Sequence, residues 1–243
     1  MVKVVLGLGL ISSEELTEKL RDRNLGVLIP CGSFEWHSSL PLSTDTIIAE
    51  KISERIAERV GYAYIPPIPY GFSIQHTSFK GTLSLSAEIY LALLKEVLSE
   101  LVRNGFRNLV VVNGHGGNRG LLEAAAISVR SNKPDVKVII FDIWKIVDEL
   151  LKDKFGKTLV IRHASSVEAS ILLYLAPDIP FKVVKSEFKL PQSLAETKEY
   201  ITTLLLAQEM TTELEIKADV KLGEQIVEEL LLIAEREIKG ETL

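Results

Sequence analysis

The chain has 243 residues, of which 47% are hydrophobic and 25% charged, and its formal net charge is −5. This composition favours a globular core over disorder, and the acidic balance without a Lys/Arg cluster argues against a nucleic-acid partner. The apolar runs are shorter than the roughly 20 residues that span a bilayer, so no membrane association is expected. One cysteine, Cys31, excludes an internal disulfide and is compatible with a cytoplasmic protein.

Strand-like apolar runs alternate with amphipathic stretches, which predicts an α/β protein with a mainly parallel sheet and helices on both faces. The predicted strands are Gly26–Cys31, Ala63–Ile68, Leu109–Asn113 and Val136–Phe141. The predicted helices are Thr46–Arg59, Ala87–Arg103, Gly120–Ser131, Val167–Leu175, Leu194–Met210 and Leu222–Ile238. No linker or repeat interrupts this pattern, so residues 1–243 are expected to form a single domain.

A first cluster of polar residues follows the predicted strand that ends at Cys31. It contains Glu35 and His37, whose i, i+2 spacing lets both side chains face one pocket in an extended segment. Asp45 comes shortly afterwards, just before a predicted helix. The alternatives are a solvated loop pair for Glu35 and His37, and a helix cap for Asp45.

The second cluster is Asn113-Gly114-His115-Gly116-Gly117-Asn118, directly after an apolar strand. Its glycines permit close backbone approach, and the start of the following helix offers N–H groups to an anion. The alternative is a phosphate-binding turn, although the spacing matches neither a P-loop nor a dinucleotide fingerprint. Because ligand sites in open α/β sheets lie beyond the carboxyl ends of the strands, we expect both clusters at one edge of the sheet.

The third cluster runs from His163 to Glu168. Ser165 or Ser166 can cap the helix that carries Glu168, which places this carboxylate about one turn into an apolar helix. A carboxylate in that position needs a partner, which can be a metal or an arginine. His76 lies in an irregular loop, where a histidine on its own is usually structural or exposed. Together the clusters supply the imidazoles and carboxylates that hydrolytic Zn, Mn or Fe sites use.

Five motifs, in order from Leu28 to about Pro177, resemble the creatininase family. They are Gly32-Ser33-x-Glu35-x-His37, Leu40-Pro41-Leu42-x-Thr44-Asp45, Tyr70-Gly71 with Phe79-x-Gly81-Thr82-Leu83-Ser84, Asn113-Gly114-His115-Gly116-Gly117-Asn118, and His163-Ala164-x-x-x-Glu168-x-Ser170. The resemblance implies a three-layer α/β/α fold, a homo-oligomer, and two divalent metal ions per chain (Zn, Mn or Fe(II)). It also implies hydrolysis of an amide C–N bond in a small molecule.

The resemblance further implies roles for individual residues. Glu35 and His115 would bind one metal, His37 would bind the other, and Asp45 would bridge the two. The implied substrate-binding residues are His76, Gly116, Gly117, Asn118 and Arg119.

Gly117 stands where creatininase has a glutamate ligand, so Glu168 is the candidate that completes the second metal, as expected in the Gly-His-Gly-Gly-Asn branch of the family. Glu168 is therefore assigned to both the metal and the catalytic set. His163 matches the family's catalytic histidine, which passes a proton to the leaving nitrogen. Arg119 and Arg162 flank the predicted rim and can bind a phosphate or carboxylate of the substrate, or simply be solvated.

Two departures from the family pattern argue against creatinine as the substrate. Ser38-Ser39 replaces a Gly-x-His stretch, one residue short, and Leu159–Arg162 lack the tryptophan that covers a flat ring in creatininase. The same branch includes an archaeal deformylase that acts on a formylamino-ribosylaminopyrimidine phosphate in flavin and deazaflavin synthesis, and a peptidase of peptide-derived cofactor maturation.

The sequence therefore predicts a metal-dependent amidohydrolase that cleaves a cyclic amide or a formamide through a metal-activated water. Three alternatives remain open. They are the deformylase reaction, a non-catalytic small-molecule-binding protein with a structural metal, and a nucleotide-binding protein without a metal.

Overall fold

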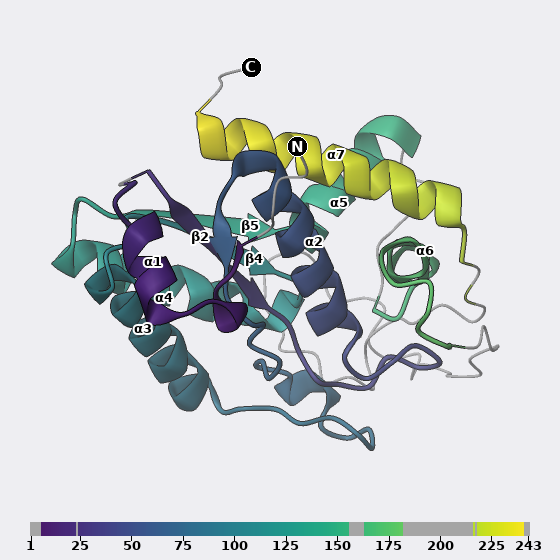
Figure 1. Cartoon of the computed structure of the whole chain (residues 1–243). Coiled ribbons are helices and arrows are strands. Elements are labelled where there is room, and N and C mark those ends of the chain that lie inside the picture. The colour runs from purple at the N-terminus through teal and green to yellow at the C-terminus, as the bar shows by residue number, and fades with distance from the viewer. Residues whose placement is uncertain (1–5, 23, 156–162, 182–215, 217, 241–243) are drawn as a thin grey trace.

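The computed structural model describes residues 6–22, 24–155, 163–181, 216 and 218–240. Five parallel strands form one sheet in the order β1-β3-β2-β4-β5. Figure 1 labels β2, β4 and β5. The strands are β1 Leu6–Gly7, β2 Gly26–Cys31, β3 Ala63–Tyr64, β4 Asn108–Asn113 and β5 Lys137–Asp142. The helices are α1 Ser13–Lys19, α2 Thr44–Val60, α3 Ala87–Arg103, α4 Arg119–Asn132, α5 Ile143–Phe155, α6 Ser166–Leu175 and α7 Val220–Lys239.

Strands β2 and β4 lie in the middle of the sheet and contribute to the core on both of its faces. Leu28 and Val110 pack with α2, α5, α6 and α7, whereas Val27, Ile29 and Leu109 pack with α3 and α4 on the opposite face. Figure 1 shows α2 and α7 on one side of the sheet and α3 and α4 on the other. Alternate residues of a strand point to opposite faces, so strands covered by helices on both sides are apolar throughout. The predicted three layers are therefore present.

The register of the two central strands determines where the polar loops begin. β2 and β4 pair in parallel from Gly26 opposite Asn108 to Cys31 opposite Asn113. Both strands thus end at the same point on one edge of the sheet. The loops that carry the first and second polar clusters start side by side, as the sequence predicts.

Some elements differ from the prediction. The strand β3 covers only Ala63–Tyr64 instead of the predicted Ala63–Ile68, because two prolines follow shortly after it. Ile68 still forms an isolated bridge with Cys31. The strand β1 and the helix α5 were not predicted. The predicted helix Leu194–Met210 lies outside the described residues. None of the described helices is long and apolar enough to cross a membrane.

Helices α6 and α7 approach each other closely at Gly223. A Cβ atom at Gly223 would lie 2.0 Å from the carbonyl oxygen of Ser170 in α6. The Ser170 hydroxyl also accepts a hydrogen bond of 2.9 Å from the backbone N–H of Asp219, just before α7. This contact holds α6, which carries Glu168, against the C-terminal helix.

Replacing Gly223 by alanine tests this contact. Gly223→Ala is expected to lower the free energy of unfolding by about 1–3 kcal/mol, because the new methyl group overlaps backbone atoms of α6. The control is Gly120→Ala in α4, where a Cβ atom would meet nothing within 4 Å. That variant should gain about 0.5–1 kcal/mol from lower chain entropy. Equal stability of the two variants in denaturant titrations would contradict the close packing.

Candidate metal centre

The first turn of α2 lies between the loops that follow β2 and β4, and two glycines make room for it. A Cβ atom at Gly32 would lie 2.3 Å from the Cα atom of Thr46, and one at Gly114 would lie 2.4 Å from the carbonyl oxygen of Asp45. The backbone N–H of Gly114 also donates to the carbonyl of Cys31 at 2.8 Å. The two loops and the helix start therefore meet at the sheet edge.

Asp45 lies at the centre of this junction. Its Oδ1 is 3.1 Å from Nε2 of His37, and its Oδ2 is 2.9 Å from Nδ1 of His115. The helix begins at Thr44 and not at Thr46, so Asp45 falls inside its first turn, and its side chain is used by the two imidazoles instead of capping the helix. The buried carboxylate also benefits from the positive end of the helix dipole.

Glu35 is fully buried, and its Oε1 lies near four imidazoles, one of which is His37 with its Nε2 at 4.0 Å. Its Oε1 lies 3.2 Å from Nδ1 of His115, 3.6 Å from Nε2 of His76 and 3.7 Å from Nδ1 of His163. Neither carboxylate oxygen of Glu35 has a hydrogen-bond partner of acceptable geometry within the described part of the chain. A buried carboxylate in this state is costly unless a cation compensates it. A solvated loop pair is therefore not what the structure shows for Glu35 and His37.

Glu168 is buried in the first turn of α6 and belongs to a capping box. Its Oε2 accepts a hydrogen bond of 2.6 Å from the backbone N–H of Ser165, whose hydroxyl accepts one of 3.3 Å from the N–H of Glu168. Burial, together with the negative charge of Asp45, raises the pKa of Glu168 to about 8. The cap thus fixes the position of a carboxyl group that needs a nearby cation to stay ionised at neutral pH.

Backbone carbonyl oxygens orient three of the histidine rings. The pairs are Nδ1 of His37 with the Glu35 oxygen at 3.1 Å, Nε2 of His115 with the Phe72 oxygen at 3.0 Å, and Nε2 of His163 with the Trp36 oxygen at 2.6 Å. A carbonyl oxygen only accepts, so the ring nitrogen that faces it carries a proton. The other nitrogen of each ring points toward the carboxylates.

Charge around the cluster favours a cation strongly. Burial opposes the charged form of His37, but the carboxylates of Asp45 and Glu35 raise its pKa to about 10. Burial also opposes the ionised form of Glu35, yet His115 holds its pKa at about 2. The carboxylates therefore attract positive charge at the ring nitrogens that face them, which are also the atoms that would bind a metal ion.

Three groups of three side chains bring their ligand atoms within 4.8 Å of one another among the described residues. They are Glu35–Asp45–His115, His37–Asp45–Glu168 and Glu35–His37–His163. The first two groups share Asp45, and together they contain all five predicted metal ligands. Nitrogen and carboxylate oxygen ligands of this kind suit Zn, Mn or Fe(II). The donor set, the burial and the unpartnered oxygens of Glu35 all fit divalent metal ions.

The structure places the predicted substrate-binding residues at varying distances from this cluster. His76 is buried and stacks on His163, with ring centroids 4.0 Å apart. Asn118 is also buried, and its amide accepts from the N–H of Phe72 and donates to the carbonyl of Gly32, both at 3.0 Å. Asn118 thus ties two loops together, and its contact with a substrate stays a prediction.

The remaining three predicted substrate-binding residues lie in or after the His115 loop. The guanidinium of Arg119 forms two hydrogen bonds, of 2.8 and 3.0 Å, with the carboxylate of Asp142 at the end of β5. A Cβ atom at Gly117 would lie 2.2 Å from the carbonyl oxygen of Phe72, whereas one at Gly116 would meet nothing within 4 Å. Arg162, the other predicted cation, lies outside the described residues.

Two residues of this region were not recognised from the sequence. The hydroxyl of Ser33 donates to Oδ2 of Asp45 at 2.9 Å. The indole of Trp36 stacks on Phe79 with ring centroids 4.1 Å apart and lies 5.9 Å from the ring of His163. Both residues lie inside the motif that runs from Gly32 to His37. Their position next to the proposed ligands in the sequence is the feature from which a role at the site could have been predicted.

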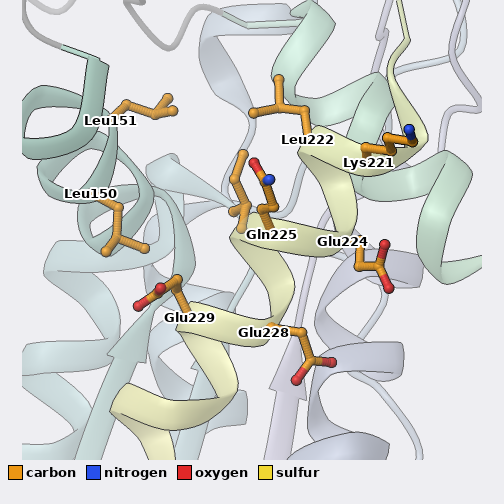
Figure 2. A pocket seen from close by; sticks show the side chains of 9 residues that line it. Leu150, Leu151, Lys221, Leu222, Glu224, Gln225, Glu228 and Glu229 are labelled. Atoms are coloured by element: carbon orange, nitrogen blue, oxygen red, sulfur yellow. The ribbon is translucent and has the colours of Figure 1, made fainter.

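A separate groove of about 690 Å³ lies between α5 and α7 (Figure 2). Leucines and glutamates line it, among them Leu150, Leu222, Glu224 and Glu229. No residue of this groove belongs to the three groups of ligand atoms. The chemistry of the polar cluster therefore does not take place in the groove.

Comparisons with known proteins give consistent matches. The family model named Creatininase, described as creatinine amidohydrolase, matches residues 10–230. The mycofactocin precursor peptide peptidase of Mycobacterium ulcerans (strain Agy99) is 36% identical over 163 residues, which cover 63% of this chain and 59% of that protein. The creatinine amidohydrolase of Pseudomonas putida is 27% identical over 169 residues, which cover 63% of this chain and 65% of that protein. The matches therefore span less than two thirds of the length of these relatives.

A crystal structure of creatinine amidohydrolase (creatininase) superposes on the chain with a TM-score of 0.82. The sequence identity is 22%, and the superposition covers 98% of each chain. This likeness confirms the predicted three-layer α/β/α fold of the creatininase type.

Two residues other than glycine have a positive φ among the described residues, and each directly follows a site histidine. Ser38 has φ 55° after His37, and Ala164 has φ 52° after His163. The left-handed conformation disfavours residues with a Cβ atom. The backbone turns sharply at both positions, and this turn helps to direct the two imidazoles toward the carboxylates.

Glycine at position 38 should relieve this strain. Ser38→Gly is expected to raise the free energy of unfolding by about 0.5–1 kcal/mol, because glycine adopts a positive φ without a steric penalty. Ser78→Gly serves as the control, since Ser78 is an exposed loop residue whose φ is not positive. This control should lose stability through added chain entropy. Thermal unfolding measures both, and a loss of stability in Ser38→Gly equal to that of the control would contradict the assignment of strain.

Proposed function

The chain belongs to the creatininase family, and from this premise we propose that it is a metal-dependent amidohydrolase that cleaves a C–N bond in a small-molecule amide. The single observation that carries the proposal is the position of Asp45. Its two oxygens face two different imidazoles, and it is shared by two groups of three ligands. A carboxylate in this position is suited to bridge two metal ions.

The proposed ligands form two groups that share Asp45. Glu35 and His115 would hold one ion together with Asp45, and His37 and Glu168 would hold the other. Ions bound there supply a Lewis acid for the amide carbonyl and lower the pKa of a bound water. The carboxylate of Glu35 is buried and has no hydrogen-bond partner of acceptable geometry among the described residues, which supports a metal site over a solvated loop.

We assign the movement of protons to His163. Its Nε2 donates to the carbonyl of Trp36, so Nδ1 is the nitrogen that faces the interior, 3.7 Å from Oε1 of Glu35. Burial, together with the neighbouring His37, lowers the pKa of His163 to about 3, which keeps the ring neutral. The free lone pair of Nδ1 would take up a proton as the water attacks, and the low pKa of the ring would then favour release of this proton to the leaving nitrogen, which is the general-acid role proposed for His163. The stacked ring of His76 holds this imidazole in place.

The other proposed substrate contacts lie in the loop that carries His115 and at the start of α4. The backbone N–H groups of Gly116 and Gly117 precede helix α4 and can stabilise the oxyanion that forms during amide hydrolysis. A Cβ atom at Gly116 would meet nothing within 4 Å, so a substrate group has room beside this residue. The guanidinium of Arg119 is already paired with Asp142, so an anionic group of the substrate would have to bind to this pair. We also retain the proposals of a single domain, a homo-oligomer and a cytoplasmic location.

For the substrate we propose a cyclic amide or a formamide. Creatinine itself is disfavoured by the shortened Ser38-Ser39 segment, although the indole of Trp36 lies near His163 and provides a flat apolar surface. Deformylation of a formylamino-ribosylaminopyrimidine phosphate is the alternative within the same chemistry. The M. ulcerans relative is named a peptidase, which makes a peptide-type amide a second class for the first assays.

Metal content tests the ligand set directly. Protein purified without chelators should contain about two equivalents of Zn, Mn or Fe per chain, and Asp45→Asn should lose most of this metal because neither group keeps its shared ligand. Glu50→Gln, on the same helix but outside the cluster, serves as the matched control. Elemental analysis provides the readout. Metal-free protein that takes up none of these ions would refute the hydrolase proposal.

Substitution of the proposed proton carrier should separate binding from turnover. His163→Asn is expected to keep the metal content and to lower kcat about 10²–10⁴-fold, because the group that transfers the proton is absent. The assay uses the amide that the unmodified enzyme hydrolyses fastest in a panel of cyclic amides, formamides and dipeptides. Full activity of His163→Asn would show that the role assigned to His163 is wrong.

A further inference from the structure

Ser33 lies next to the cluster of proposed metal ligands but belongs to none of the three groups that would bind an ion. Its side chain is fully buried, and its hydroxyl donates to Oδ2 of Asp45 at 2.9 Å. The backbone carbonyl of Ser33 accepts a hydrogen bond of 2.8 Å from the hydroxyl of Thr46. Ser33 is therefore attached to the first turn of α2 by its main chain and by its side chain, which fixes the direction of its hydroxyl.

The contacts of the two Asp45 oxygens are unequal. Among the described residues, the imidazole of His37 is the hydrogen-bond partner of Oδ1, at 3.1 Å, whereas Oδ2 has two partners, His115 and the hydroxyl of Ser33, both at 2.9 Å. The terminal torsion of an aspartate is soft and has broad energy wells. A carboxylate that is to serve two ions, one with each oxygen, therefore needs a fixed donor that holds its plane. Ser33 is the hydroxyl donor to Asp45 among the described residues.

A catalytic role of Ser33 itself does not fit these contacts. A serine nucleophile needs a neighbouring base that takes its proton, usually a histidine. The hydroxyl of Ser33 instead donates to Oδ2 of Asp45, and no histidine ring accepts a hydrogen bond from it among the described residues. The carboxylate that accepts this proton already faces the imidazoles of His37 and His115, so the contacts of Ser33 are those of a donor that orients Asp45.

We propose that Ser33 is a positioning residue that locks the carboxylate of Asp45 in the orientation in which each oxygen serves a different metal ion. This inference rests on the proposed dinuclear function. Partners that orient metal ligands typically change metal affinity about 10–100-fold when they are removed. Because Ser33 acts on the shared ligand, its loss should weaken the binding of the second ion and leave a first ion bound.

The experiment uses the metal-free full chain and titrates it with Mn²⁺. Calorimetry measures the affinity of each ion, and electron paramagnetic resonance reports whether two Mn²⁺ ions are magnetically coupled through a shared ligand. In Ser33→Ala, we expect the second ion to bind about 10–100-fold more weakly and the coupled signal to be lost. The matched control is Ser53→Ala, since Ser53 is an equally buried serine on α2 whose hydroxyl donates to the carbonyl of Ala49 at 2.7 Å.

A second variant separates positioning from simple packing. Ser33→Thr keeps the hydroxyl but is larger, so it should bind the second ion more tightly than Ser33→Ala if the hydrogen bond matters. If Ser33 only filled space, the smaller alanine would be tolerated better, and this reversed order would overturn the inference. Loss of both ions in Ser33→Ala, with both retained in the control Ser53→Ala, would also overturn the inference, because Ser33 would then be needed for the binding of either ion.

The two proposals fail in distinguishable ways. If the unmodified chain binds two coupled ions and Ser33→Ala does the same with unchanged affinities, the positioning role is wrong and the proposed function stands. If the unmodified chain does not bind a second ion, the dinuclear function is wrong, and the inference on Ser33 is wrong with it.

Discussion

Three carboxylates are buried at one edge of the sheet, and the rest of the site depends on how this negative charge is balanced. Glu35, Asp45 and Glu168 are each less than 5% exposed. Burying carboxylates side by side is unfavourable unless positive charge lies between them. The surrounding histidines supply ring nitrogens that point at the carboxylates, and these same nitrogens can bind a metal after they lose a proton. The charge of the cluster and its affinity for cations are thus one property.

The fold brings this charge together through the backbone. Parallel pairing makes β2 and β4 end at the same level, and glycines at 32 and 114 let the first turn of α2 come between the two loops. Helix α6 is held by α7 at Gly223 and presents Glu168 from the same helical layer as α2. Each ligand therefore lies on a helix, or in a loop directly after a strand, whose position is fixed by the packing of the core, which limits the movement of the carboxylates away from one another.

The sequence predicted most of this arrangement where a strand was a long apolar run and polar residues followed it directly. Apolar runs identified β2 and β4, and the order of polar residues after them placed His115 and Glu35 at one edge. Two-residue strands such as β1 carry no alternation that could be recognised, and α5 follows β5 without a turn signal. The hydrogen bond from Ser33 and the pair of Arg119 with Asp142 depend on side-chain directions that only the folded chain determines.

The three histidines are oriented by main-chain oxygens, and this has a consequence for how the family can diversify. The carbonyl groups of residues 35, 36 and 72 belong to the peptide backbone, so no point substitution removes them. Side chains such as Trp36 and Phe72 can therefore change over evolutionary time while the tautomer of each imidazole is preserved. The orientation of the three imidazoles therefore depends on the main chain of these residues, and their side chains can differ without altering it.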